Sequence, residues 1–245
     1  DATVRARVIP LQTWLDDVEV SAGTLILIRD LTELRDRDRQ LVTKDATIRE
    51  IHHRVKNNLQ TVAALLRLQS RRMSNSDAKD ALKQAMGRVS AIAVVHEILS
   101  QNFEEQVAFD EVADRILHMV GDVAASSGSV VARREGSFGE VPAETATALS
   151  LATTELCQNA IEHSLDSSSG NVIVRPHRTD DALVVDIVSD GKPLPEGFSL
   201  DNHRSSLGLS IVTTLMQDLG GTFTLEDNSD RVGTCARLVI PLQRL

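Results

Sequence analysis

The feature that most constrains this sequence is the stretch from residue 44 to residue 74, which contains neither glycine nor proline. Its apolar residues recur with a seven-residue spacing in two rows, Ile48, Val55 and Val62 in one and Leu59 and Leu66 in the other. This spacing predicts a long amphipathic helix with a coiled-coil-like seam. The charged residues 31–43 before it predict a solvated helical lead-in.

A second helix is predicted after the SNSD turn at residues 74–77. Its apolar rows are Leu82 and Val89, and then Ala85, Ile92 and Leu99. Two long helices joined by a short polar turn form an antiparallel hairpin. Because each helix has its own apolar stripe and a lone hairpin cannot cover both, we expect dimerisation into a four-helix bundle.

Residues 3–30 consist of short β-like runs, and residues 20–29 are interpreted as a turn around Gly23 followed by a buried strand. Two or three strands do not form an independent sheet domain. We therefore expect this segment to be the end of something larger, or to pack on a partner. The chain starts at Asp1 rather than Met, which favours a fragment of a longer protein.

The pattern changes after residue 101, where helices and strands are predicted to alternate. Helices are expected at about 109–126, 142–163 and 207–219, and strands at 129–134, 171–176, 183–189, 222–226 and 234–241. This order favours a two-layer α/β sandwich with a mostly antiparallel sheet. The predicted fold class is α+β, a long helical hairpin followed by such a sandwich.

Composition excludes several classes of protein. The net charge is −9 and only 2% of residues are aromatic, which opposes direct nucleic-acid binding. Cys157 and Cys235 belong to no CxxC or Cys/His cluster, which favours a reducing, cytoplasmic environment. No apolar run approaches the roughly 20 residues of a membrane span, and no signal peptide opens the chain.

The predicted helix at 142–163 carries polar residues at helical spacing, namely Glu155, Asn159, and Glu162 or His163. Residues so spaced share one face of a helix. An asparagine there can donate to phosphate while its carbonyl oxygen binds a hard cation such as Mg²⁺. A polar stripe on a surface helix explains the same spacing equally well.

Two further segments suit nucleotide binding. Ser189, Asp190 and Gly191 follow an apolar strand, and an acidic residue in such a turn can accept a hydrogen bond from an adenine amino group; an ordinary Asp–Gly turn is the simpler reading. Residues 205–212, SSLGLSIV, place a small-residue loop at a helix start, where backbone N–H groups bind anions. In this order, with Gly233 and Thr234 before the last strand, the segments form a specific set.

The three segments resemble the N, G1 and G2 boxes of the GHKL (Bergerat) ATP-binding fold of histidine kinases and DNA gyrase. Residues 50–60, EIHHRVKNNLQ, resemble the H-R-x-K-N phosphoacceptor box of a subfamily of two-component sensor histidine kinases. The resemblance covers roughly residues 40–245, and residues 17–36 resemble the last strands and exit helix of a PAS sensor domain. The implied domains are a PAS-like end (1–36), a dimerisation and phosphotransfer hairpin (37–107) and a catalytic ATP-binding domain (108–245).

The resemblance implies that His53, directly before Arg54, is the phosphoacceptor. Helix geometry agrees, because one heptad before Leu59 lies His52, which places His52 on the seam and His53 just outside it. Lys56 and Asn57 lie one turn further along and are implied to position phosphates or to orient the imidazole, although Lys56 also suits a solvated face. His96 falls on the seam of the second helix and is interpreted as a core histidine.

In the ATP-binding part, the resemblance implies that Asn159 coordinates Mg²⁺ and that Glu155, one turn earlier, orients or activates the reacting groups. It also implies that His163 lines the phosphate side of the nucleotide site. Nucleotide contacts are further implied for Asp190, Gly191, Ser206, Gly208 and Leu209. The G1 box departs from the usual D-x-G-x-G pattern, because gapless alignment puts Ser189 at the Asp position and Pro193 at the second Gly. Either Asp190 reads adenine through a one-residue shift, or Ser189 does so more weakly.

The sequence thus predicts a dimeric, cytoplasmic sensor histidine kinase core that uses Mg²⁺ and ATP. It would phosphorylate His53 and pass the phosphoryl group to an Asp of a response regulator, with no direct nucleic-acid contact. Two alternatives stay open. One is a GHKL ATPase or serine/threonine kinase whose hairpin only dimerises, and the other is a degenerate kinase that acts as a signalling scaffold.

Overall fold

The computed structural model describes residues 3–15, 18–101, 106–125, 130–165, 169–200, 207–228 and 232–242. It consists of two compact units, residues 1–50 and residues 51–245. Within the described residues, no helix is both long enough and apolar enough to cross a membrane.

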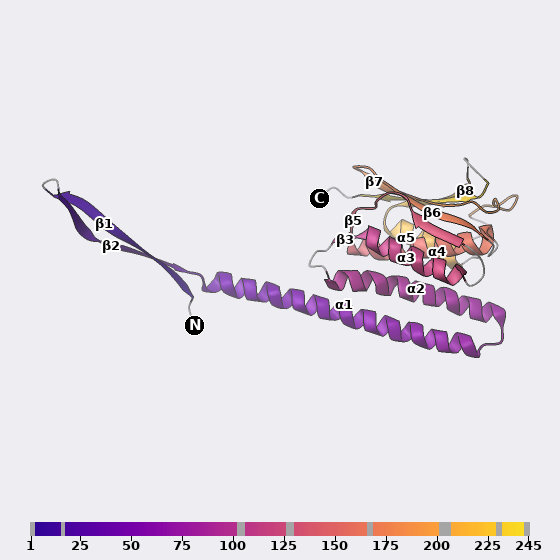
Figure 1. Ribbon diagram of the computed structural model, residues 1–245, viewed down its shortest axis with the longest axis horizontal. Coiled ribbons are helices and arrows are strands. Elements are labelled where there is room, and N and C mark those ends of the chain that lie inside the picture. The colour runs from indigo at the N-terminus through magenta and orange to yellow at the C-terminus, as the bar shows by residue number, and fades with distance from the viewer. Residues whose placement is uncertain are drawn as a thin grey trace. The chain divides into compact units, whose positions relative to one another are not determined.

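The first unit contains a two-stranded antiparallel ribbon of β1 (Val4–Leu15) and β2 (Val18–Asp30), drawn in indigo in Figure 1. Gly23 lies inside β2 opposite Leu11, next to a register shift, so the predicted turn at Gly23 is wrong. The predicted buried strand is also wrong, because Leu25 and Ile28 are exposed. No second layer covers the ribbon among the described residues of this unit.

The predicted lead-in and first hairpin helix form one continuous helix, α1 (Thr32–Arg72). Asp30 fixes its start, because Asp30 Oδ1 accepts hydrogen bonds from the backbone N–H of Thr32 at 2.8 Å and from its hydroxyl at 2.6 Å. These bonds satisfy a helix N-terminus in the manner of a capping residue. They also hold the pKa of Asp30 below its ordinary value.

The predicted hairpin is present, with α2 (Ser76–Gln101) following α1 after a short turn. Asn75 caps α2, because its Oδ1 accepts hydrogen bonds from the backbone N–H groups of Asp77 and Ala78. Along α1, Leu59 and Leu66 are half-buried. Other large apolar side chains of α1 are exposed and are called its outer stripe here, namely Ile48, Ile51, Val62, Leu65 and Leu68.

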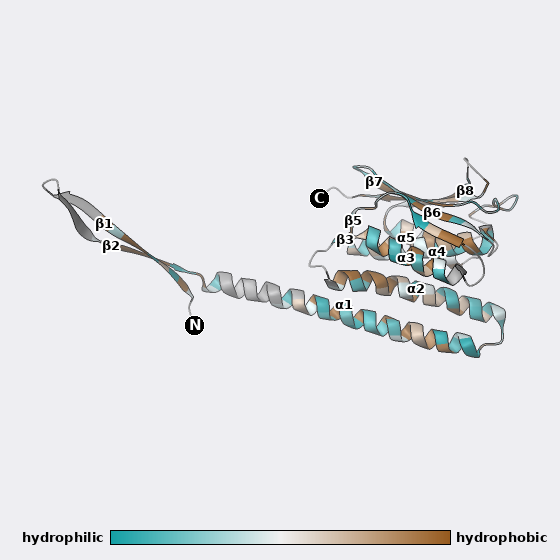
Figure 2. Ribbon diagram, in the orientation of Figure 1, coloured by the Kyte–Doolittle hydropathy of each residue, from teal (hydrophilic) through white to brown (hydrophobic). Residues whose placement is uncertain are grey.

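Helix α2 packs against the rest of the second unit, which departs from the expectation that both hairpin stripes need a second chain. Val95, Ile98 and Leu99 are buried in one core with α3 (Phe109–Ala125) and α4 (Ala143–Asn159). In Figure 2 the half of α2 that leads to residue 101 is accordingly brown. The stripe of α2 is therefore covered within the chain, whereas the outer stripe of α1 is not.

Residues 106–242, called the C-terminal domain here, form the predicted two-layer sandwich. Its sheet has the order β4-β6-β7-β9-β8, with β4 parallel to β6 and all other pairs antiparallel. The strands are β4 (Val130–Arg134), β6 (Gly170–Arg178), β7 (Ala182–Ser189), β8 (Thr222–Asp227) and β9 (Thr234–Pro241). Helices α3, α4 and α5 (Leu207–Asp218) form the other layer (Figure 1).

Alternation along the strands builds the core. On β7, Leu183, Val185 and Ile187 are buried, while the residues between them lie on the outer face of the sheet. Two short strands, β3 (Gln106–Ala108) and β5 (Glu140–Pro142), form a separate two-stranded sheet that was not predicted from the sequence. Phe109 and Phe138 are fully buried there, with their rings edge to face at 4.8 Å.

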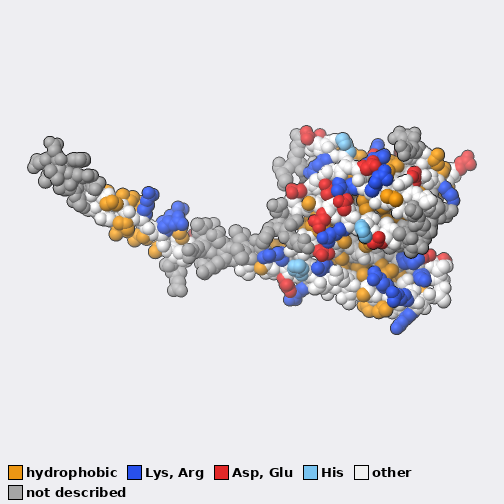
Figure 3. All heavy atoms as spheres, viewed as in Figure 1, with side chains coloured by type: hydrophobic (Ala, Val, Ile, Leu, Met, Phe, Trp, Pro, Cys, Tyr) orange, Lys and Arg blue, Asp and Glu red, His pale blue; other side chains and the backbone are white. Residues whose placement is uncertain are grey.

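The outer surface carries paired charges. Arg237 binds Asp186 through two hydrogen bonds of 2.6 and 2.9 Å, and Glu135 accepts from Arg133 and Arg175. Acidic and basic side chains are correspondingly intermixed over the face seen in Figure 3. Both cysteines are free thiols, and burial raises the pKa of Cys157 to about 12, which leaves that thiol unreactive.

Candidate functional site

Helix α4 is the central element of the candidate site, and it is buried along most of its length. Leu149, Ala152 and Leu156 are in the core. The helix runs into a π-helical turn, Ala160–Ser164, in which the backbone N–H of Leu165 donates to the carbonyl of Ala160 at 3.0 Å. Such turns shift the angular position of the residues that follow and are frequent at functional sites.

The polar residues of α4 and this turn face two different neighbours, whereas the sequence predicted one shared face. Gln84 on α2 donates from Nε2 to Glu162 Oε2 at 3.2 Å. Asn159 and His163 instead line a pocket. Glu162 therefore belongs to the contact with α2, and His163 to the pocket.

The pocket has a volume of about 500 Å³ and lies between α4, the start of α5, the sheet and the loop after β7. Its walls are mostly apolar, formed by Leu156, Ala160, Ile187, Pro193, Leu194, Pro195, Phe198, Leu209, Leu225 and Ala236. Its polar lining residues are Asn159, His163, Lys192 and Thr234. An apolar cavity with a few convergent polar groups is the usual form of a small-molecule site.

Asn159 carries the clearest sign of a missing ligand. Its Nδ2 is buried and has no hydrogen-bond partner among the described residues. Buried polar atoms in native proteins are rarely left unpaired, so an acceptor on a ligand is the expected partner. The amide oxygen of the same side chain is a ligand type that Mg²⁺ accepts. The residues present thus fit a nucleotide with its metal ion.

Glu155 makes a contact that the sequence did not suggest. Its carboxylate is 3% exposed and accepts two hydrogen bonds from Arg88 on α2, from Nε at 2.6 Å and from Nη2 at 2.9 Å. This is the bidentate geometry that makes arginine–carboxylate pairs strong. The hydrogen bonds to Glu155 raise the pKa of Arg88 above its ordinary value. Glu155, which was expected to orient or activate the reacting groups, is therefore bound by Arg88 of the hairpin.

Gly208 lies against the same carboxylate at the start of α5. A Cβ atom at this position would stand 2.7 Å from Glu155 Oε2 and 3.6 Å from Asn159 Nδ2. The glycine therefore leaves room for the acid, in addition to any role beside phosphates. Leu209 lines the pocket, and Ser206 lies outside the described residues.

The turn after β7 separates its two polar residues. Ser189 is buried, and its Oγ lies 2.9 Å from Thr234 Oγ1 on β9. Asp190 is exposed and accepts hydrogen bonds from Asn171, at 2.7 Å from the backbone and 2.5 Å from the side chain. Although partial burial acts to raise it, these bonds hold the pKa of Asp190 below its ordinary value.

Asp190 is consequently not brought to the pocket, and the same holds for the adjacent Gly191, because neither is among the lining residues. The alternative in which Ser189 occupies the base-reading position agrees better with this geometry. Ser189 sits directly behind Thr234, which does line the pocket.

The adjacent histidines on α1 differ in environment as helix geometry predicted. His52 is half-buried, with its Nδ1 2.9 Å from Nδ1 of His96 on α2. Burial first, and the neighbouring imidazoles second, lower the pKa of both His52 and His96. His53 is exposed to solvent.

Lys56 is half-buried and Asn57 is exposed on the same stretch of α1. The carbonyl of Asn57 accepts a hydrogen bond from the Thr61 hydroxyl within the helix. None of His53, Lys56 and Asn57 lines the pocket, so the structure does not bring the predicted phosphoacceptor box and the predicted nucleotide residues together.

Three residues of this region were not singled out as site residues in the sequence. Arg88 lies 67 residues before Glu155, and no local pattern links the two. Thr234 was noted only as part of a Gly–Thr pair. Lys192, in the loop DGKPLP, lines the pocket and adds a cation that suits phosphate. Its position directly after the Asp–Gly turn is the signal that would have identified it.

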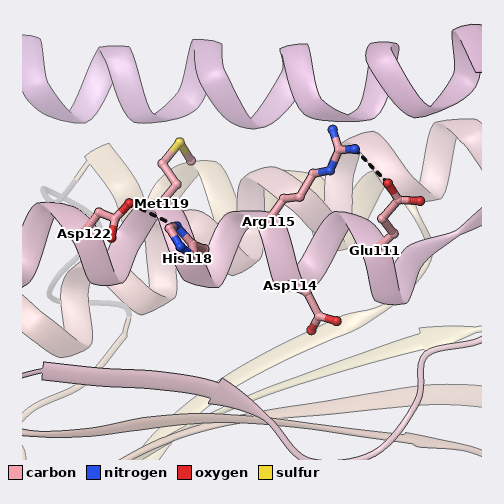
Figure 4. A pocket seen from close by; sticks show the side chains of 6 residues that line it. All are labelled: Glu111, Asp114, Arg115, His118, Met119 and Asp122. Atoms are coloured by element: carbon pink, nitrogen blue, oxygen red, sulfur yellow. Dashed lines mark hydrogen bonds and ion pairs between the residues drawn. The ribbon is translucent and has the colours of Figure 1, made fainter.

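A second hollow lies along α3 and is open to solvent (Figure 4). The charged side chains that line it are paired: Arg115 with Glu111 at 2.8 Å, His118 with Asp122 at 3.0 Å, and Asp114 with Arg134 on β4. No group of three or more metal-ligating side chains occurs in the described ranges. The hollow therefore has no unsatisfied group comparable to Asn159.

Comparison with known protein families gives two matches in chain order. Residues 50–124 match the HisKA_2 model, described as histidine kinase. Residues 144–244 match the HATPase_c model, described as histidine kinase-, DNA gyrase B-, and HSP90-like ATPase. The first contains the hairpin with His53, and the second contains the pocket.

Individual relatives agree with these matches. The chain is 49% identical to sensor histidine kinase PdtaS of Mycobacterium tuberculosis over an alignment of 246 positions, which covers 99% of this chain and 48% of that protein. It is 48% identical to PdtaS of Mycolicibacterium smegmatis over 91% of this chain and 45% of that protein. The chain thus spans about half the length of these curated relatives.

A solved structure shares the architecture as well. The histidine kinase domain of the EL346 blue-light activated histidine kinase from Erythrobacter litoralis has a TM-score of 0.58 and 26% identity, covering 84% of this chain and 94% of that one. With the hairpin, the GHKL-type ATPase domain and these relatives all in agreement, the chain belongs to the sensor histidine kinases.

Proposed function

We propose that this chain binds Mg·ATP in the pocket of the C-terminal domain and transfers the γ-phosphoryl group to His53. The observation that carries the proposal is the buried, unpartnered Nδ2 of Asn159, which points to an acceptor on a bound ligand. The apolar slot beside it is large enough for a purine, and His163 and Lys192 line it. Together these groups suit a base at one end and phosphates at the other.

The roles of the chain's own residues follow from their placement. An imidazole nitrogen of His53 with a free lone pair attacks the γ-phosphorus, the bond to the bridging oxygen breaks, and ADP leaves with that electron pair. His53 suits this role because it is exposed, whereas His52 is engaged with His96. Catalysis of such a transfer rests on positioning and charge neutralisation.

Mg²⁺, when bound, would neutralise phosphate charge, and Asn159 Oδ1 is the residue atom that would hold it. Glu155 would orient groups from one turn earlier on α4 after it separates from Arg88. Lys56 and Asn57 would meet the phosphates or steady the His53 ring, once the hairpin and the pocket face each other. Ser206, Gly208 and Leu209 would bound the phosphate end, at the start of α5.

The proposal extends to assembly and partners. The exposed apolar stripe of α1 supports a homodimer in which two hairpins form a four-helix bundle. A receiver-domain Asp of a response regulator would take the phosphoryl group from His53, in the cytosol. Residues 1–36 would be the end of a PAS-like sensor domain, with the hairpin domain at 37–107 and the catalytic domain at 108–245.

Incubation with γ-labelled ATP and Mg²⁺ tests the reaction class. We expect label on the protein that is lost in acid and retained in base, as for phosphohistidine. Asn159→Ala should abolish labelling, whereas Gln217→Ala, a matched amide truncation at an exposed position of α5, should retain it. Acid-stable label would favour a serine/threonine kinase instead, and no label together with loss of nucleotide binding would favour a scaffold.

A further inference from the structure

At its sheet end the pocket is lined by one hydroxyl side chain, which is contacted by a second hydroxyl from the neighbouring strand. Thr234 lines the pocket from β9, and its Oγ1 lies 2.9 Å from Oγ of Ser189 on β7. The backbone N–H of Thr234 also donates to Ser189 Oγ, at 3.3 Å. Ser189 is 1% exposed and Thr234 is 9% exposed, so the pair is shielded from bulk water.

The close approach of the two strands fixes this pair. Gly233 has a φ of +134°, and a Cβ at that position would collide with the carbonyl of Ser189. The residues that line the same pocket are mostly apolar and include Ile187, Leu156 and Ala236. A flat aromatic base between these walls would meet Thr234 Oγ1 as the polar atom nearest its edge.

No carboxylate reaches this end of the pocket from the described residues. The lining contains neither Asp nor Glu, and the carboxylate next in sequence, Asp190, is bound to Asn171. This absence matters because a carboxylate only accepts hydrogen bonds at neutral pH, and would therefore select a purine that presents an amino group at position 6. It would repel a purine with a carbonyl oxygen there.

A hydroxyl pair has no such bias, because each hydroxyl both donates and accepts. When Thr234 donates to Ser189, Thr234 Oγ1 offers a lone pair to an amino group of adenine. When Ser189 donates to Thr234, the Thr234 proton is released toward a carbonyl oxygen of guanine. Reversing the direction of one 2.9 Å hydrogen bond therefore switches the pair between the two bases.

We propose that Thr234, oriented by Ser189, is the base-reading residue of this pocket and that the pocket takes guanine as well as adenine nucleotides. The proposal rests on the proposed function, because it assumes that a purine nucleotide occupies this site. It adds the base specificity of that function: the pocket would accept a purine with either an amino group or a carbonyl group at position 6.

Calorimetric titration of the whole chain with ADP and with GDP, each with Mg²⁺, tests this without any catalytic step. We expect dissociation constants within about tenfold of each other, a difference of at most about 1.4 kcal/mol. An ADP affinity more than 100-fold above that for GDP would overturn the proposal. Loss of binding for both nucleotides would instead contradict the proposed function, so the two failures are distinguishable.

Two variants assign the effect to the hydroxyl pair. Ser189→Asp should weaken GDP binding at least tenfold relative to ADP. Thr234→Val, which keeps the shape and removes the hydroxyl, should weaken both nucleotides similarly, while Thr224→Val on the exposed side of β8 should change neither. Circular dichroism confirms folding of each variant. An unchanged ratio of the two affinities in folded Ser189→Asp, or unchanged binding in Thr234→Val, would contradict the assignment.

Discussion

The outer stripe of α1 and the core of the C-terminal domain are both rich in Leu, Ile and Val, yet only the core is complete within one chain. Leu65 on α1 is 56% exposed, whereas Leu149 on α4 is fully buried. Helix α2 belongs to the hairpin, but its apolar face is buried against α3 and α4 of the same chain. The apolar face of α2 is thus buried within the chain, whereas the outer stripe of α1 is exposed.

The difference indicates how the two regions contribute to function. A domain with a closed core can hold a pocket in a fixed shape, which suits binding of a small molecule. A helix with an open apolar stripe depends on another surface for its stability. The ion pair of Arg88 on α2 with Glu155 on α4 links the hairpin to the C-terminal domain beside the pocket.

Breaking that link should have the largest effect on stability. Arg88→Ala leaves the carboxylate of Glu155 buried without its partner, and removal of one member of a buried ion pair costs about 3–5 kcal/mol. Denaturant unfolding should show this loss. Lys83→Ala, which removes an exposed ion pair with Asp80 within α2 itself, should cost less than about 1 kcal/mol. Equal losses in both variants would show that Arg88 does not attach α2 to the domain.

A pair of leucine truncations measures the contrast between core and stripe directly. Leu149→Ala creates a cavity in a closed core and should cost about 2–5 kcal/mol. Leu65→Ala removes an already exposed side chain and should cost less than about 0.5 kcal/mol at protein concentrations too low for association. Thermal or denaturant unfolding checks both values, and a large loss for Leu65→Ala under these conditions would mean that its stripe is covered within the chain.

Charges on the open stripe should change assembly rather than folding. Val62→Glu with Leu65→Glu places two carboxylates on the surface proposed for the dimer, so light scattering should report one chain instead of two. Gln60→Glu with Arg67→Gln lowers the net charge by the same two units at exposed positions of α1 off the stripe and should leave two chains. A single-chain mass for the unmodified protein would contradict the four-helix bundle.

The smallest effect is expected from the histidine pair that joins the hairpin helices. The pKa values of His52 and His96 are lowered by burial and by neighbouring imidazoles, so the folded state binds protons less readily than the unfolded chain. Stability should therefore be unaffected above pH 6.5, the ordinary histidine pKa, and should fall as the pH drops below about 6.5. His96→Gln should flatten this part of the pH profile in denaturant unfolding, and an unchanged slope would contradict it.

Local periodicity predicted most of the fold. The heptads predicted both hairpin helices, strand alternation predicted the sheet, and the helix expected at 207–219 is α5. The charged residues 31–43 were expected as a helical lead-in, and they form the first turns of α1. The strands β3 and β5 are three residues each and too short to show a pattern.

The candidate site was predicted less completely, because its contacts join distant segments. Asn159 and His163 line the pocket as their box suggested, but Asp190 does not, since Asn171 on the neighbouring strand binds it. The Ser189–Thr234 pair depends on the register of β7 and β9, and the Arg88–Glu155 pair depends on how α2 packs on α4. No spacing within either segment encodes these pairings.

The central claim is that His53 receives the phosphoryl group. The most direct measurement is labelling by γ-labelled ATP of the unmodified chain, His53→Gln and His52→Gln, with folding checked by circular dichroism. We predict that His53→Gln carries no label and that His52→Gln, which loses only the contact with His96, keeps it. Full labelling of His53→Gln together with loss of label in His52→Gln would contradict the account and move the phosphoacceptor to the half-buried histidine.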